Sequence, residues 1–202
     1  MMDKVATQIL ELFKHLVRDI FAYLVGGLLI IVNILFIDTQ FFNKAFYLYV
    51  INYDEYLPVI IVLFSYGLGQ LIMGFMYLAI ELSGIEKYIK KLPRFKYSSD
   101  LEDEIFIFIK NKDAYDFFVE RYNYLSYFRW SLAGAGLISF LIDVAALAKY
   151  GYNPIIVASS IFMIVTFLIF LLLHYQTDHD FNSRVKILNK VIKNIDKQNK
   201  PE

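Results

Sequence analysis

Cysteine is absent from this chain of 202 residues, which excludes disulfides, thiolate metal sites and a cysteine nucleophile. The chain also lacks the HExxH, GxSxG, P-loop and glycine-rich dinucleotide motifs of common enzyme classes. It contains no internal repeat and no low-complexity segment. The sequence therefore predicts a protein that is not an enzyme and has no cofactor.

Apolar and aromatic residues, by contrast, make up 58% and 18% of the chain, too much for an ordinary soluble domain of this length. Four apolar runs are each long enough to cross a hydrocarbon core of ~30 Å at ~1.5 Å per residue. They are predicted to be membrane spans at residues 20–37, 58–80, 130–148 and 155–175. The first run ends without a small-residue cleavage signature, so it is predicted to be a retained helix and not a signal peptide.

Basic residues lie almost entirely on one side of these runs. The first and third connecting segments carry only Lys44 and Lys149, and the other 18 of the 20 Lys and Arg residues lie in the two termini and the second connection. Because basic segments stay in the cytoplasm, this pattern predicts four crossings with both termini cytoplasmic. The predicted location is the inner (plasma) membrane, with the lipid bilayer as the first partner.

The segments between the spans also carry structural signals. Residues 1–19 have an apolar helical stripe and no breaker before the first span, and residues 38–57 form an aromatic-rich outer loop. Residues 81–129 predict two amphipathic helices, one beginning near Leu101 and one after Asp113 that leads into the third span. Residues 149–154 form an outer turn. The predicted fold class is all-α: a four-transmembrane-helix bundle with helical cytoplasmic extensions.

The cytoplasmic tail, residues 176–202, is predicted to be an amphipathic helix. Its apolar residues are spaced 4-3-4-3, which is a short heptad seam of Phe181, Val185, Leu188, Ile192 and Ile195. Two heptads are too short to be stable alone. The seam is therefore expected to pack against the other cytoplasmic helices or against copies of itself in a homo-oligomer.

Polar residues inside the spans are few. Asp143 is the only ionisable residue well inside a span, where a charge costs about 2.5–3.5 kcal/mol, and Asn33 lies at nearly the same depth. A hydrogen bond from the Asn33 amide would lower the cost of burying Asp143, so the two residues are expected to form a polar clamp. They could instead line a cavity or permeation path, or Asp143 could reach the outer headgroups near Lys149. Gln70 is the third intramembrane polar residue.

Small residues recur at spacings that allow close approach of helices. They are expected to pack spans within one subunit or, as the alternative, between subunits of a homo-oligomer. This set comprises Ala22, Gly26, Ser65, Gly69, Gly74, Ser131, Ala135 and Ser139.

The inner interface is predicted to be marked by long basic side chains and one indole. These residues are Arg18, Arg121, Arg129 and Trp130. Farther along, His174 and Asp178 share a helical face that His179 does not, so no metal site is predicted.

The stretch Arg121–Leu132, which leads into the third span, is similar to entries seen in small four-span membrane proteins of prokaryotic antiviral systems. The whole-chain layout resembles the same group, which includes CRISPR-associated accessory proteins and membrane effectors of nucleotide-signalled defence. This resemblance implies regulation of a cytoplasmic nuclease or perturbation of the membrane during infection. It assigns no functional residue.

Three functions remain open from the sequence. The first is an oligomeric membrane regulator or effector whose cytoplasmic helices receive a protein partner or a signal, with pore formation as one outcome. The second is a scaffold that anchors a soluble partner, and the third is a narrow channel or small transporter that depends on Asn33, Gln70 and Asp143. A single intramembrane acid argues against an ion-coupled transporter. No direct binding of nucleic acid is expected.

Overall fold

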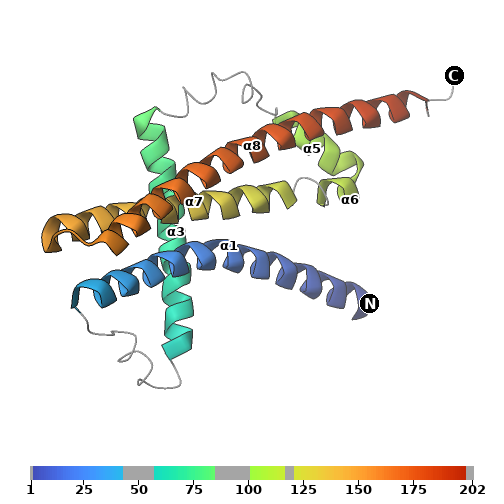
Figure 1. Ribbon diagram of the computed structural model, residues 1–202. Coiled ribbons are helices and arrows are strands. Elements are labelled where there is room, and N and C mark those ends of the chain that lie inside the picture. Colours follow the sequence, from blue (N-terminus) through green and yellow to red (C-terminus); the bar gives the residue numbers. More distant parts are fainter. Residues whose placement is uncertain (1, 43–56, 85–100, 117–120, 199–202) are drawn as a thin grey trace. The chain divides into compact units, whose positions relative to one another are not determined.

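The computed structural model describes residues 2–42, 57–84, 101–116 and 121–198, and every regular element among them is a helix. The helices in chain order are α1 (Met2–Phe42), α3 (Leu57–Ser83), α5 (Leu101–Lys110), α6 (Lys112–Tyr115), α7 (Arg121–Tyr150) and α8 (Pro154–Gln198) (Figure 1). Segments of α1, α3, α7 and α8 are long and apolar enough to cross a membrane. The prediction of an all-helical chain with four candidate spans is confirmed.

The chain divides into two compact units. Unit 1 comprises Met1–Ala79 and Phe128–Leu171, and unit 2 comprises Ile80–Tyr127 and Leu172–Glu202. Both α7 and α8 pass from one unit to the other without a break in the helix. α8 is one helix of 45 residues, which contains both the predicted fourth span and most of the predicted cytoplasmic tail.

A tight turn joins α7 to α8 in unit 1. Gly151 ends α7 with a φ of 95°, a conformation that suits glycine, and its N–H donates to the Leu147 carbonyl at 3.0 Å. The Asn153 side chain then caps α8 by accepting from the Ile155 N–H at 2.9 Å. Pro154 is the first residue of α8, where its missing N–H leaves no hydrogen bond unmade.

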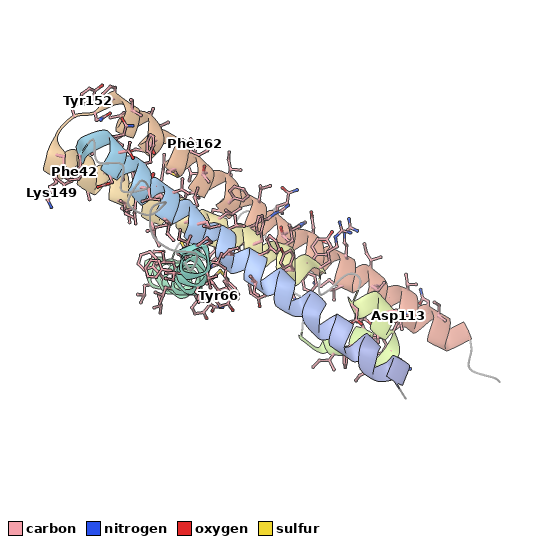
Figure 2. All side chains as sticks on the ribbon, turned by 90° about the horizontal axis from the view of Figure 1, so that it is seen from below. Phe42, Tyr66, Asp113, Lys149, Tyr152 and Phe162 are labelled. Atoms are coloured by element: carbon pink, nitrogen blue, oxygen red, sulfur yellow. The ribbon has the colours of Figure 1, made fainter. Side chains whose placement is uncertain are left out.

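Helix α1 includes the amphipathic N-terminal arm and the predicted first span, and it continues to Phe42, so residues 38–42 of the predicted outer loop are helical. Phe41 and Phe42 pack on the ring of Tyr150, at centroid distances of 5.3 and 5.0 Å, which holds this last turn. Figure 2 shows Phe42, Lys149 and Tyr152 at the same end of unit 1. The rest of the expected loop, residues 43–56, lies outside the described residues.

Unit 2 is built from α5, α6 and the ends of α7 and α8. Where one helix is expected after Asp113, α6 ends at Tyr115 and α7 begins at Arg121, and residues 117–120 lie outside the described part. Aromatic and cationic contacts join these elements, with the Tyr122 ring 6.2 Å from Phe181 and Lys193 over the ring of Phe106 at 5.3 Å.

The predicted tail seam is buried in part. Val185 is buried, Phe181, Leu188 and Ile192 are half-buried, and Ile195 is exposed. Asn182 and Asn189 lie on the buried face as well. The heptad pattern did not include these two residues because it counts apolar positions alone.

Candidate functional site

Close helix crossings hold unit 1 together, and they depend on glycine. A Cβ added at Gly27 would meet the backbone of Ser65, and one added at Gly69 would meet the backbone of Tyr23. The backbones of α1 and α3 are therefore in direct contact at two points. The rings of Tyr23 and Tyr66 pack edge to face beside this crossing, 5.8 Å apart.

Helix α7 contacts the other three helices of unit 1 through its small residues. Ser131 lies against Gly26 of α1, and Gly134 lies against the Ile72 side chain of α3. A Cβ at Gly136 would stand 2.9 Å from the Phe167 nitrogen of α8. Since lipid is as apolar as these side chains, such close packing is the usual source of helix association in a membrane.

Seven of the eight small residues singled out in the sequence are buried inside unit 1. The exception is Gly74, which is exposed and has no atom within 4 Å of an added Cβ. Gly27, Gly134 and Gly136 were missed, although each stands next to, or two residues from, another glycine. Closely spaced glycines were therefore a second signal beside the small-xxx-small spacing.

A fully buried polar cluster lies where α1, α7 and α8 meet. The Asn33 amide nitrogen donates to Asp143 Oδ1 at 2.9 Å and to the Ser139 carbonyl at 3.3 Å. The Ser159 hydroxyl donates to Asn33 Oδ1 at 3.4 Å, and the side chains of Ser159 and Ser160 both lie beside the Asp143 carboxylate. Asn33 and Asp143 are 1% and 0% exposed. The structure thus brings together the two residues that depth alone had paired.

Two oxygens of this cluster have no hydrogen-bond partner: Asp143 Oδ2 and Ser139 Oγ. In the described part of the chain, no Lys, Arg or His lies in ion-pair contact with Asp143. Asp143 Oδ1 therefore accepts a hydrogen bond and Oδ2 accepts none, because the neighbouring hydroxyls of Ser159 and Ser160 donate to Asn33 Oδ1 and to the Ile156 carbonyl. A buried charge is tolerated only when it is paired or fully hydrogen-bonded, so this half of the carboxylate is the least satisfied group in unit 1.

An apolar layer covers the cluster on the side of the α7–α8 turn. Ile37, Ala146 and Ile156 are buried together there, one helical turn from Asn33, Asp143 and Ser160 respectively. Partly buried side chains complete the layer: Phe36, Phe41, Ile142 and Leu147. The polar cluster is therefore separated from the end of the helices by packed hydrocarbon.

Gln70 does not belong to this cluster. It is exposed on α3, and its amide nitrogen donates to the Tyr66 hydroxyl of the same helix at 3.1 Å. Of the three intramembrane polar residues predicted as a clamp or cavity, the structure joins Asn33 and Asp143 and leaves Gln70 apart.

The predicted interface anchors have different surroundings. Arg121 is exposed and Arg129 is half-buried, while Arg18 lies in α1 with its side chain outside the described part. Trp130 is only 8% exposed. Its indole packs inside the protein, and its place at the inner interface stays a prediction.

A second polar cluster joins α7 and α8 within unit 2. The Ser126 hydroxyl donates to Asp178 Oδ1 at 2.9 Å and lies 2.9 Å from His174 Nδ1. His174 Nε2 lies 3.5 Å from Asp178 Oδ2. The sequence grouped His174 with Asp178 but missed Ser126, which is 48 residues away from His174.

The Ser126 hydroxyl lies 2.9 Å from both Asp178 Oδ1 and His174 Nδ1, so these three side chains join α7 to α8 within unit 2. His179 turns away and contacts Asp180 at 3.6 Å. The described residues contain no group of three or more His, Cys, Asp or Glu that could hold a metal ion.

Comparison with known proteins gives no match: no family model, no curated protein and no solved structure resembles this chain. The functional interpretation therefore rests on the geometry of the two clusters and on the helices that carry them.

Proposed function

We propose that this chain is a non-enzymatic regulator or effector of the inner membrane, in which a cytoplasmic helical unit acts on a membrane-spanning unit. Unit 1 would be the spanning part and unit 2 the cytoplasmic part. The observation that carries the proposal is the continuity of α7 and α8 through both units. A helix transmits force along its axis, whereas a flexible loop at the same place would not.

The α7–α8 pair is fastened within each unit separately. In unit 1, Gly136 permits backbone contact with α8 near Phe167, and in unit 2, Ser126 binds Asp178. Because these contacts fix the two helices to each other on both sides of the boundary, a change in unit 2 that moves one helix is expected to move its neighbour as well. This is the physical basis for a regulator that senses a cytoplasmic partner.

Coupling can be measured with intrinsic and added probes. Trp130, the single tryptophan, reports on unit 1, and a thiol introduced at exposed Lys190 reports on unit 2 of this cysteine-free chain. We expect both probes to show one unfolding transition in detergent. Two glycines inserted after Tyr127 together with two inserted after Leu171 break α7 and α8 at the unit boundary. In this variant the single unfolding transition should split into two.

The matched control carries the same insertion after Asn111, where no helix is interrupted, and should retain a single transition. Two transitions in the unaltered chain would contradict the proposal. So would a single transition that survives both helix breaks.

Orientation is the next element of the proposal, with the N- and C-termini cytoplasmic and the α7–α8 turn outside. It rests on the 18 to 2 distribution of basic residues. Reporter fusions after Asn52 and Gly151 should report an outer location, and fusions after Tyr97 and Lys197 a cytoplasmic one. A cytoplasmic signal from the Asn52 fusion would reject this topology.

Self-association is proposed because one face of α3 is unusual for a lipid-facing surface. Gly67, Gln70 and Gly74 share an exposed face, and an added Cβ at either glycine would meet nothing within 4 Å. An amide both donates and accepts, so two copies of Gln70 can bind each other while the glycines allow close approach.

Native mass spectrometry in mild detergent should therefore show a homo-oligomer, and Gln70→Leu combined with Gly74→Leu should weaken it. The matched control is Val62→Leu on the same exposed helix. A monomer that persists at high protein concentration would count against self-association.

The second candidate function is a membrane scaffold that anchors a soluble partner, and the apolar layer favours a scaffold over a channel. Ile37, Ala146 and Ile156 leave no polar path between the cluster and the end of the helices. Liposomes containing the protein are therefore expected to show no ion flux. Flux above that of empty liposomes would favour the channel instead.

The resemblance to small membrane proteins of antiviral systems supplies the proposed biological setting, with a soluble nuclease or nucleotide-signalling enzyme as the cytoplasmic partner. Phage plating on cells with and without the chain and its neighbouring genes tests this setting. Equal plaque counts would reject the antiviral setting but would not bear on the proposed coupling of the two units.

A further inference from the structure

Three buried oxygens in the described part of unit 1 have no hydrogen-bond partner, and two of them, Ser139 Oγ and Asp143 Oδ2, belong to the polar cluster around Asn33. Ser139 and Asp143 are four residues apart, so their side chains lie on the same helical face, and both are 0% exposed. Asn33 bridges them, because its amide nitrogen contacts the Ser139 carbonyl and Asp143 Oδ1. The carboxylate oxygen turned away from Asn33 and the hydroxyl of Ser139 are left without a partner.

We propose that this cluster is a sodium-binding site, in which Asp143 Oδ2 and Ser139 Oγ bind the ion and the hydroxyls of Ser159 and Ser160 complete its coordination. The inference concerns a ligand of unit 1 and does not depend on the coupling function proposed above.

The donor set determines the class of ion. Carboxylate and hydroxyl oxygens are hard ligands, and the site has no sulfur or imidazole ligand that a transition metal prefers. One carboxylate supplies one negative charge, which a monovalent ion neutralises, whereas Ca²⁺ and Mg²⁺ sites normally combine several carboxylates or carboxylates with many waters. A sodium ion would also replace the missing partner of Asp143 Oδ2, which is the costliest defect of the cluster.

The surroundings suit an ion that stays and not one that passes through. The layer of Ile37, Ala146 and Ile156 closes one side. On the other side α7 is tightly packed, with Ser131 against Gly26 and Gly136 against α8. A bound ion in this site would exchange only when the helices separate locally, so binding is expected to stabilise the protein without conduction.

The test is the melting temperature of the full chain in detergent, followed by Trp130 fluorescence, in sodium, potassium and choline chloride at equal ionic strength. We expect the melting temperature in sodium to exceed that in choline by about 5–10 °C when sodium is present at about 100-fold its Kd. Asp143→Asn should fold and lose this difference. Ser139→Ala should need an about tenfold higher sodium concentration for the same shift.

Thr166→Val is the matched control, since Thr166 lies on α8 outside the cluster and its hydroxyl is bound to the Phe162 carbonyl at 2.8 Å. It should keep the full response to sodium. Equal melting temperatures in sodium and choline would overturn the site, as would an unchanged response in Ser139→Ala. A melting temperature that varies with pH but not with sodium would also overturn it, because a proton would then be the occupant of the carboxylate.

Discussion

Gly69→Ala and Gly27→Ala are each expected to destabilise the protein by about 3 kcal/mol, the upper end of the range for overpacking. The added methyl would meet backbone atoms of Tyr23 in the first case and of Ser65 in the second. A side chain can rotate away from such a contact, but a helix backbone can relieve it only if α1 and α3 move apart. Their separation would also disturb the ring contact of Tyr23 with Tyr66.

The same helix supplies the controls for this prediction. Gly67→Ala and Gly74→Ala add the same methyl to α3 where nothing of the same chain lies within 4 Å. At protein concentrations low enough for the chain to be monomeric, they should change the unfolding free energy by no more than about 0.5 kcal/mol. Denaturant titration of the four variants in detergent makes the comparison. If all four variants lose the same stability, the cause is helical conformation and not the α1–α3 crossing.

Asn33→Leu is expected to cost about 3–5 kcal/mol, more than removal of the acid that it binds. The substitution removes the hydrogen bond from Asn33 to Asp143 Oδ1, and Oδ2 has no hydrogen-bond partner to begin with. The buried carboxylate then lies beside a leucine. Asp143→Leu should instead cost about 0.6–2 kcal/mol, because it removes the charge along with the hydrogen bond. Asp143→Asn should keep the fold, since an amide can still accept from Asn33.

A double-mutant cycle separates this account from simple additivity. The variant with both Asn33→Leu and Asp143→Leu should be more stable than Asn33→Leu alone, because no buried charge remains. Gln70→Leu is the matched control at protein concentrations low enough for the chain to be monomeric, as it removes an amide that lies on an exposed face. Additive losses in the double variant would show that Asn33 and Asp143 do not depend on each other.

Span positions and the depth of polar residues were predictable from the sequence. Apolar runs fixed where the four candidate spans lie, and counting residues along them placed Asn33 and Asp143 at the same level. The same counting finds Ser159 and Ser160, which lie five and six residues beyond the start of α8. They were missed because hydroxyls in a span were not considered.

Which face of each helix packs inside the protein was not predictable. A core-facing side chain and a lipid-facing one are equally apolar, so hydropathy does not show which face of a span packs inward. For this reason the sequence grouped Gln70 with Asn33 although Gln70 is exposed on α3, and it did not indicate that Trp130 is buried. The exact end of α1 at Phe42 was not predictable for a different reason. The contact of Phe42 with Tyr150 joins residues more than a hundred positions apart in the sequence.

The tight turn at Gly151–Asn153 bears on how the chain is inserted during synthesis. Because so few residues separate α7 from α8, the two spans would leave the translocation machinery as a hairpin. Asp143 would then enter the bilayer together with the hydroxyls of Ser159 and Ser160. Asn33, which belongs to the first span, would already have been inserted. Lengthening this turn is therefore expected to impair biogenesis of the third span more than it alters the finished protein.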